Sequence, residues 1–159
     1  MNAGNDPAAW QNFYIMIGTA NAAITGLLFV ALSMHLKQIL SHPIYKPRAI
    51  VVLLILTTQI VISAIVLAPQ PRVLMGVEIL GINFFFLAVN LRNRAPLTIT
   101  GGTALTIAFR AIYVLASLSL ITGIGGGFYI LGGILTLTVA RSLSSCWTLL
   151  TAVEADTAV

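Results

Sequence analysis

Three charged residues of this sequence fall inside long apolar stretches, where a charge is costly and therefore informative. They are Glu78, Arg110 and Arg141. A charged side chain within a bilayer costs about 2.5–3.5 kcal/mol on insertion scales, so such residues usually face the interior of a helix bundle or a wet cavity. Counted at 1.5 Å per helical residue, Glu78 and Arg110 lie about 9 Å and 18 Å from the same side of the membrane. Since a long arginine side chain can close much of that gap, we expect a Glu78–Arg110 ion pair, with a structural role favoured over a functional one.

Two series of polar residues recur at helical spacing, and each is centred on one of these arginines. The series are Thr103, Thr106, Arg110, Tyr113 and Ser117, and Thr138, Arg141, Ser145 and Thr148. Spacings of three and four put each series on one face of a helix. The favoured interpretation is hydrogen bonding between packed helices. The alternative is a water-lined path with cationic walls, which would select anions.

Small residues mark a second face, near the start of the chain. Gly18, Ala22 and Gly26 follow one another at spacing four, with Asn21 beside them. This small-xxx-small pattern lets two helix backbones approach closely. We expect it to seat either another helix of the same chain or a second subunit.

No arrangement of residues indicates catalysis, a metal or a cofactor. The sequence has no P-loop, HExxH, GxSxG or CxxC motif, and Cys146 is its single cysteine. His35 and His42 lie seven residues apart, close to one expected membrane interface. Without an acid–base pair or a nucleophile beside a base, the sequence predicts a protein that is not an enzyme and has no cofactor.

The amino-acid composition indicates whether these residues lie in water or in a lipid bilayer. Hydrophobic residues make up 58% of the 159 residues and charged residues 8%, and mean hydropathy is +1.01. A soluble domain has about a quarter of its residues charged, so this class is excluded. The eight basic residues are scattered, which argues against a nucleic-acid partner despite a pI near 9.7. The expected partner is the lipid bilayer.

The apolar runs predict an all-α integral membrane protein, a single bundle over residues 1–159. The five expected transmembrane helices cover about residues 9–40, 49–68, 73–91, 97–122 and 128–152. Proline-rich turns separate the first three, and the glycine run at 123–127 separates the last two. The alternative is four spans, with residues 92–110 forming a long cytoplasmic stretch.

Basic residues orient the five-span bundle. Lys37, Lys46, Arg48, Arg92 and Arg94 would lie on one side of the membrane and only Arg72 on the other. Under the positive-inside rule the N-terminus is outside and the C-terminus cytoplasmic.

Several segments together resemble a known group of proteins. They are the run from Gly18 to Ser33, Leu67-Ala68-Pro69-Gln70, Gly76-Val77-Glu78, Gly126-Gly127-Phe128-Tyr129 and Trp147-Thr148-Leu149-Leu150. The chain is similar to small multi-span inner-membrane proteins of actinobacteria and other bacteria, a family of unknown function. The resemblance implies a multi-pass protein of the bacterial inner membrane and implies no activity.

The sequence therefore favours a non-enzymatic membrane protein with minimal loops. It would be either a self-assembling homo-oligomer or an accessory subunit beside other membrane protein subunits. The alternative is an oligomeric channel or small-solute pathway, with anions as candidate solutes. That pathway would be lined by the fourth and fifth expected helices and their polar series.

Overall fold

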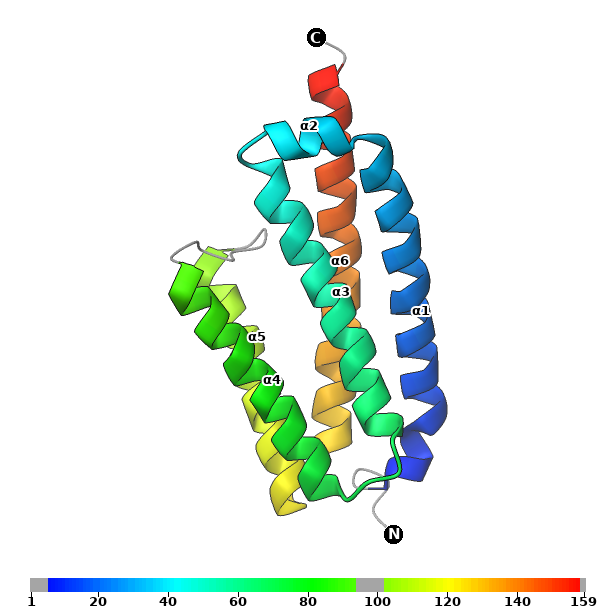
Figure 1. Cartoon of the computed structure of the whole chain (residues 1–159). Helices are drawn as coiled ribbons and strands as arrows, with labels where there is room; N and C mark the ends of the chain where they lie inside the picture. Colours follow the sequence, from blue (N-terminus) through cyan, green and yellow to red (C-terminus); the bar gives the residue numbers. More distant parts are fainter. Residues whose placement is uncertain (1–5, 94–101, 158–159) are drawn as a thin grey trace.

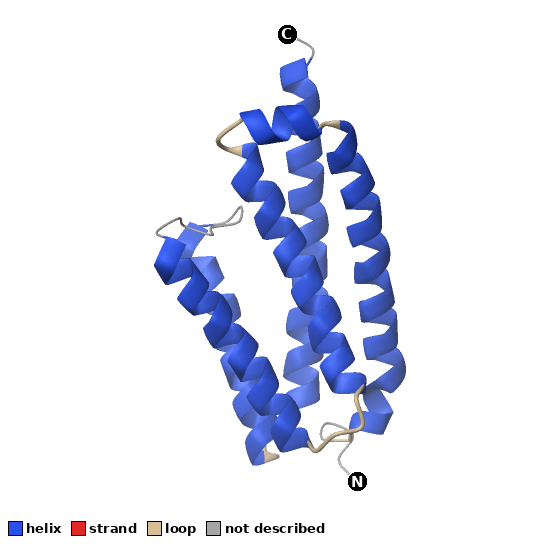
Figure 2. Cartoon of the chain, in the orientation of Figure 1, coloured by secondary structure: helices blue, strands red, loops and turns tan. Residues whose placement is uncertain are grey.

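The structure is a computed structural model, and it describes most of the chain. It covers residues 6–93 and 102–157, with side chains except at 38, 89–93, 102–104 and 154–157. Six helices occur in these residues: α1 (Pro7–Met34), α2 (Leu36–Ser41), α3 (Tyr45–Leu67), α4 (Arg72–Asn93), α5 (Gly102–Thr122) and α6 (Gly127–Thr157). No strand occurs in the described part of the chain, as Figure 2 shows.

The five long helices run alternately up and down, and the short α2 lies across one end of the bundle (Figure 1). The start of α1 and the end of α6 are at opposite ends of the bundle, and α2 lies at the end where α6 finishes, called the C-terminal end below. The helix α4 runs beside α5, and both diverge from α3 toward the C-terminal end. The all-helical prediction is confirmed for the described residues.

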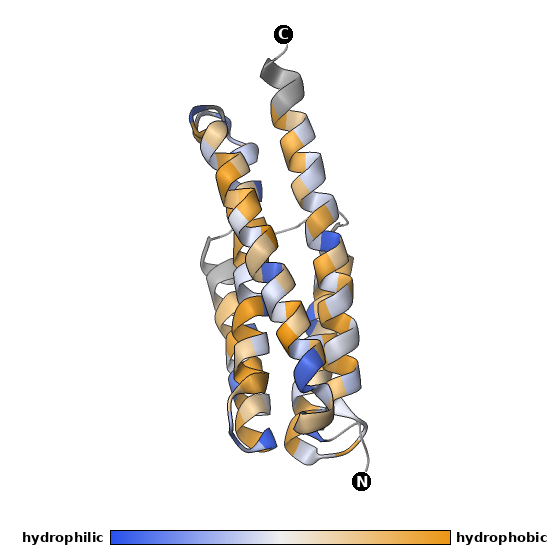
Figure 3. Ribbon diagram, turned by 90° about the vertical axis from the view of Figure 1, so that its right-hand side faces the viewer, coloured by the Kyte–Doolittle hydropathy of each residue, from blue (hydrophilic) through white to orange (hydrophobic). Residues whose placement is uncertain are grey.

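Four of the helices are long and apolar enough to cross a membrane. They contain the stretches Pro7–Met34, Tyr45–Leu67, Leu105–Thr122 and Gly127–Val153. Hydrophobic residues extend along the length of the helices in Figure 3. Because large side chains such as Leu27, Phe29 and Trp147 are exposed on the outside of the bundle, the architecture is compatible with a multi-pass membrane protein. The third expected span, 73–91, coincides with α4, which is not one of these four stretches.

Two expected boundaries were wrong at the start of the bundle. The apolar run 9–40 does not form one helix, because α1 ends at Met34 and the chain bends at His35 into α2. A helix of 28 residues is already about 42 Å long, more than a hydrocarbon core of about 30 Å needs. The next helix begins at Tyr45, so it includes Pro47. Proline is tolerated there because the first helical turn leaves its N–H groups without partners.

The glycine run ends α5 as expected. Gly123, Gly125 and Gly126 have φ angles of 73°, 87° and 69°. These left-handed conformations are strained for residues with a Cβ, so the glycines permit the tight reversal between α5 and α6. The four-span alternative is not supported over its whole length, since residues 105–110 belong to a candidate span and not to a cytoplasmic stretch.

The core consists of two apolar clusters at different heights. The cluster toward the N-terminal end draws on α1, α3, α4, α5 and α6, and includes Tyr14, Ile62, Ile79 and Phe128. The cluster toward the C-terminal end includes Leu32, Ile39 and Leu149, and within the described side chains it contains no residue of α4 or α5. The bundle is therefore tightly closed at one end, and α4 and α5 stand apart from the core at the other.

Tyr14 ties the closed end together. Its ring is completely buried and its hydroxyl donates to the Phe128 carbonyl at 3.3 Å, which joins α1 to α6. We expect Tyr14→Phe to lower the free energy of unfolding by about 1 kcal/mol, the scale of interhelical hydrogen bonds in membranes. Tyr129→Phe is the matched control, because the Tyr129 side chain is largely exposed. Thermal unfolding of both variants in one detergent measures the difference, and equal stabilities would refute the role of the Tyr14 hydroxyl.

Candidate functional site

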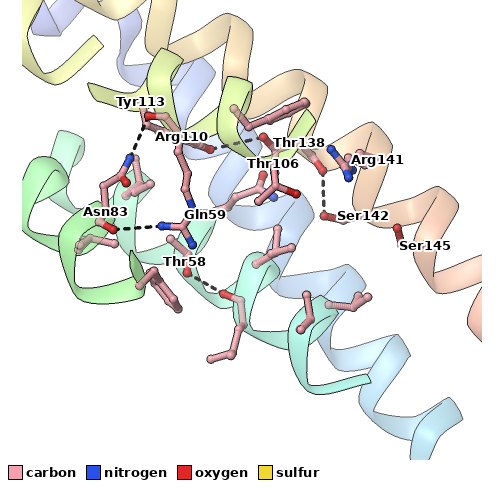
Figure 4. A pocket seen from close by; sticks show the side chains of 18 of the residues that line it. Thr58, Gln59, Asn83, Thr106, Arg110, Tyr113, Thr138, Arg141, Ser142 and Ser145 are labelled. Carbon is pink, nitrogen blue, oxygen red and sulfur yellow. Dashed lines mark hydrogen bonds between the residues drawn. The ribbon is translucent and has the colours of Figure 1, made fainter. Parts of the chain in front are cut away.

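A pocket lies inside the bundle, between α3, α4, α5 and α6. Its volume is about 170 Å³, more than ten times the roughly 10–15 Å³ that a single water needs. Figure 4 shows it from close by. The polar residues that line it are Thr58, Gln59, Asn83, Thr106, Arg110, Tyr113, Thr138, Arg141, Ser142 and Ser145. The other lining residues are apolar, and no aspartate or glutamate with a described side chain lines the pocket.

Arg110 and Asn83 hold α5 and α4 together across one wall of the pocket. The Arg110 guanidinium donates to the Asn83 backbone carbonyl at 3.3 Å, and the Asn83 amide donates to the Arg110 carbonyl at 3.2 Å. In Figure 4 the Arg110 side chain extends from α5 across the pocket. Because its partner is a neutral carbonyl, this contact positions the guanidinium without neutralising its charge.

The opposite wall comes from α6, and Arg141 is its cation. The guanidinium carbon of Arg141 lies 5.2 Å from the centre of the Phe109 ring of α5, within cation–π range. Ser142 lies beside it, and its hydroxyl donates to the Thr138 carbonyl at 2.8 Å. Tyr113 and Thr138 join α5 to α6 through a hydroxyl–hydroxyl contact of 3.4 Å. The two predicted polar faces therefore do meet, and they meet at this pocket.

Gln59 contributes an unpartnered donor from α3. Its side chain is 1% exposed, and its oxygen accepts a hydrogen bond from the Asn21 amide at 3.3 Å. Its Nε2 atom is buried and has no hydrogen-bond partner among the residues that the structure describes. A buried N–H group without an acceptor is costly, which makes it a group that an acceptor in the pocket would satisfy.

The expected Glu78–Arg110 ion pair is absent, because each residue has another partner. A Glu78 carboxylate oxygen accepts from Gln70 Nε2 at 2.9 Å, and the same nitrogen donates to the Ile65 carbonyl at 2.9 Å. Glu78 therefore stabilises the turn between α3 and α4, at the closed end of the bundle. Arg110 lies further along, at the level of Asn83.

The structure places the nine residues of the two polar series in different environments. Six of them line the pocket, namely Thr106, Arg110, Tyr113, Thr138, Arg141 and Ser145. Ser117 is buried away from the pocket and donates to the Tyr113 carbonyl at 2.8 Å. Thr148 is exposed and donates to the Ser145 carbonyl of its own helix at 3.0 Å. Thr103 lies in the first turn of α5, and its side chain is outside the described residues.

Sequence reasoning missed Thr58 and Ser142 as pocket residues. Ser142 carried a signal, because it lies four residues after Thr138 and beside Arg141. Gln59 and Asn83 were visible only as polar residues inside apolar helices. Nothing in their spacing reveals that they converge, since they come from α3 and α4 rather than from the two helices with polar series.

The expected small-residue face is divided between the inside and the outside of the bundle. A Cβ on Gly18 would lie 3.1 Å from the Ser63 Cβ, so Gly18 permits close contact between α1 and α3. Asn21 is completely buried on the same side. Ala22 and Gly26 are exposed instead, and a Cβ on Gly26 would meet nothing within 4 Å.

The described residues contain no group of three or more His, Cys, Asp or Glu side chains that could hold a metal ion. Comparison of the chain with known protein families, curated proteins and solved structures gives no match.

Proposed function

We propose that this chain is a non-enzymatic multi-pass membrane protein that binds an anionic ligand in the pocket between α3, α4, α5 and α6. The observation that carries the proposal is Arg110, whose partner is an uncharged carbonyl in a pocket that no described acidic side chain lines. Arg141 and the Gln59 Nε2 donor strengthen it. A guanidinium at membrane depth is costly unless a counter-charge or water solvates it, and an anion in the pocket would supply the counter-charge.

The proposal includes the five-span topology. The helix α4 would be the remaining span, because it has 22 residues and packs beside α5. Five crossings would put the two termini on opposite sides of the membrane, which is consistent with α1 beginning and α6 ending at opposite ends of the bundle in Figure 1. Lys37, Lys46 and Arg48 belong to α2 and the first turn of α3, at the C-terminal end of the bundle. This charge bias supports a cytoplasmic C-terminus and an external N-terminus in a bacterial inner membrane.

Thiol chemistry tests the cationic pocket directly. On a Cys146→Ala background, a Ser142→Cys variant should react with a small sulfonate-bearing methanethiosulfonate faster than with the trimethylammonium reagent of similar size. The expected ratio is about tenfold, because a positive site concentrates anions by that order or more. Adding Arg110→Gln should bring the two rates together.

Ser117→Cys is the matched control for this experiment. Ser117 is as buried as Ser142 but does not line the pocket, so its thiol should resist both reagents. Equal rates for the two reagents at Ser142→Cys would contradict an anion-binding pocket. Failure of both reagents to react there, while Ser117→Cys does react, would contradict the pocket itself.

A second candidate function is assembly, either with copies of this chain or as a subunit of a larger membrane complex. It is favoured by Ala22 and Gly26, which face outward with open space around Gly26. Gly26→Leu should then disperse a homo-oligomer or release co-purified chains, as native mass spectrometry from mild detergent measures. A particle of unchanged mass would argue against this face. The pathway alternative predicts anion flux in liposomes that depends on Arg110 and Arg141.

A further inference from the structure

Both pocket arginines lie in the half of the bundle that carries α2 and the end of α6. Arg110 follows Gly102, the first residue of α5, by eight residues, or about 12 Å. Arg141 follows Gly127 by fourteen residues, or about 21 Å, in a hydrocarbon core about 30 Å thick. Both cations are therefore within about 12 Å of the interface at the C-terminal end. Lipid phosphates lie at that interface.

The pocket continues from these donors into an apolar region. Ile62 of α3 and Ile79 of α4 line it toward the closed end of the bundle, and they are 2% and 1% exposed. Ile55 and Ile82 belong to the same two walls. A ligand that is only a small, hydrated anion would leave this surface without a contact. An occupant with an anionic group and an apolar chain would match both regions.

The side of the pocket between α3 and α4 faces out of the bundle. Leu54 on α3 lines the pocket and is 36% exposed, and Phe86 on α4 is half-buried at the same level. The two helices diverge toward the C-terminal end in Figure 1, and no described residue of α4 or α5 joins the core cluster at that end. Surfaces on the outside of a transmembrane bundle contact lipid. An occupant can therefore enter from the bilayer without crossing the headgroup region as a free ion.

We propose that the ligand is an anionic membrane lipid from the leaflet at the C-terminal end. Its phosphate would lie between Arg110 and Arg141 with Gln59 Nε2 as a further donor, and an acyl chain would lie against the apolar walls of α3 and α4. This assignment rests on the proposed anion-binding function and specifies its ligand. Lys37, Lys46 and Arg48 at the same end favour anionic lipids in the surrounding leaflet.

Native mass spectrometry of the full chain in mild detergent tests the assignment. The protein is titrated with phosphatidylglycerol, with phosphatidylcholine of the same acyl chains, and with inorganic phosphate. We expect one phosphatidylglycerol to be retained at least tenfold more tightly than phosphatidylcholine. This comparison uses the wild-type chain, so it does not depend on the folding of a variant.

Variants then locate the bound lipid. Arg110→Gln combined with Arg141→Gln should abolish the preference for phosphatidylglycerol. Arg48→Gln removes the same kind of charge from an exposed position outside the pocket, and should change the apparent Kd by less than threefold. Ile82→Trp fills the apolar wall and should weaken phosphatidylglycerol binding about tenfold.

The outcomes separate the two proposals. If inorganic phosphate binds through the arginines but phosphatidylglycerol shows no advantage over it, the lipid assignment is wrong and the anion-binding function stands. If the two lipids bind equally and phosphate does not bind, both proposals fail. If the double arginine variant keeps the wild-type preference, the lipid lies elsewhere on the bundle and the assignment is again overturned.

Discussion

Replacing Gly76 with alanine is expected to lower the stability of the bundle by about 2 kcal/mol, although alanine is the better helix former. A Cβ on Gly76 would lie 2.7 Å from Ile121 Cγ1 and 2.8 Å from the Ser117 carbonyl oxygen. The carbonyl is backbone and cannot rotate away, so α4 must move off α5. Overpacking of this kind costs about 1–3 kcal/mol, and a collision with backbone belongs at the upper end. The higher helix propensity of alanine offsets about 1 kcal/mol of this cost, which leaves a net loss of about 2 kcal/mol.

Gly81→Ala on the same helix is the matched control. Nothing lies within 4 Å of the Cβ that it would add. It should therefore show only the propensity gain, and be at least as stable as the wild-type chain. Unfolding of both variants, followed by helical circular dichroism in one detergent, measures the difference. If Gly76→Ala were as stable as Gly81→Ala, the close contact between α4 and α5 would not exist in the folded protein.

The same substitution should also disturb the pocket. The contact at Gly76 sets how closely α4 approaches α5, and Asn83 lies two turns further along α4. Moving α4 away lengthens both hydrogen bonds between Asn83 and Arg110. We therefore expect Gly76→Ala, and not Gly81→Ala, to reduce the difference in reagent rates at Ser142→Cys.

The helices were predictable from the sequence because local chemistry ends them. Pro69 and Pro71 separate α3 from α4, and the glycines at 123, 125 and 126 adopt conformations that other residues avoid. The bend at His35 was not predictable in this way. The residues on both sides of it are apolar, and no proline or glycine marks the position.

Asn83 was not predicted as the partner of Arg110, although counting residues along the helices places the two at the same depth. Asn83 lies eleven residues past Arg72, or about 17 Å, and Arg110 lies about 18 Å from the same side. The count therefore favours Asn83 over Glu78, which is at about 9 Å. Glu78 was predicted instead because its charge is opposite to that of Arg110. The actual acceptor is a backbone carbonyl, which every residue has, so the sequence does not reveal it. Nor could spacing along single helices reveal that Gln59 of α3 joins the same pocket.

A paired substitution at Asn21 and Gln59 is expected to give the second large effect. Both side chains are almost completely buried, and Asn21 donates to Gln59 Oε1 at 3.3 Å and to the Ile17 carbonyl at 2.8 Å. Asn21→Leu would leave both polar atoms of the Gln59 amide without a partner among the described residues. A buried polar group left unpaired costs about 1–3 kcal/mol, whereas replacing both partners with apolar groups is nearly neutral.

The loss of unfolding free energy in the double Leu variant should therefore be smaller than the sum of the losses in the two single variants. We expect a coupling of about 1–2 kcal/mol, measured by unfolding of the wild type, both singles and the double. Strictly additive effects would mean that the two amides do not depend on each other in the folded protein.

Lipid binding should rank the wild type, the two single variants and the double variant in a different order from stability. Gln59 lines the pocket and Asn21 does not. Gln59→Leu and the double variant should bind phosphatidylglycerol more weakly, because both lose the Nε2 donor, while Asn21→Leu should bind within threefold of the wild type. The double variant would then be close to wild type in stability and defective in binding. A double variant that is stable and binds normally would remove Gln59 from the site, and would leave Arg110 and Arg141 as the groups that hold the anion.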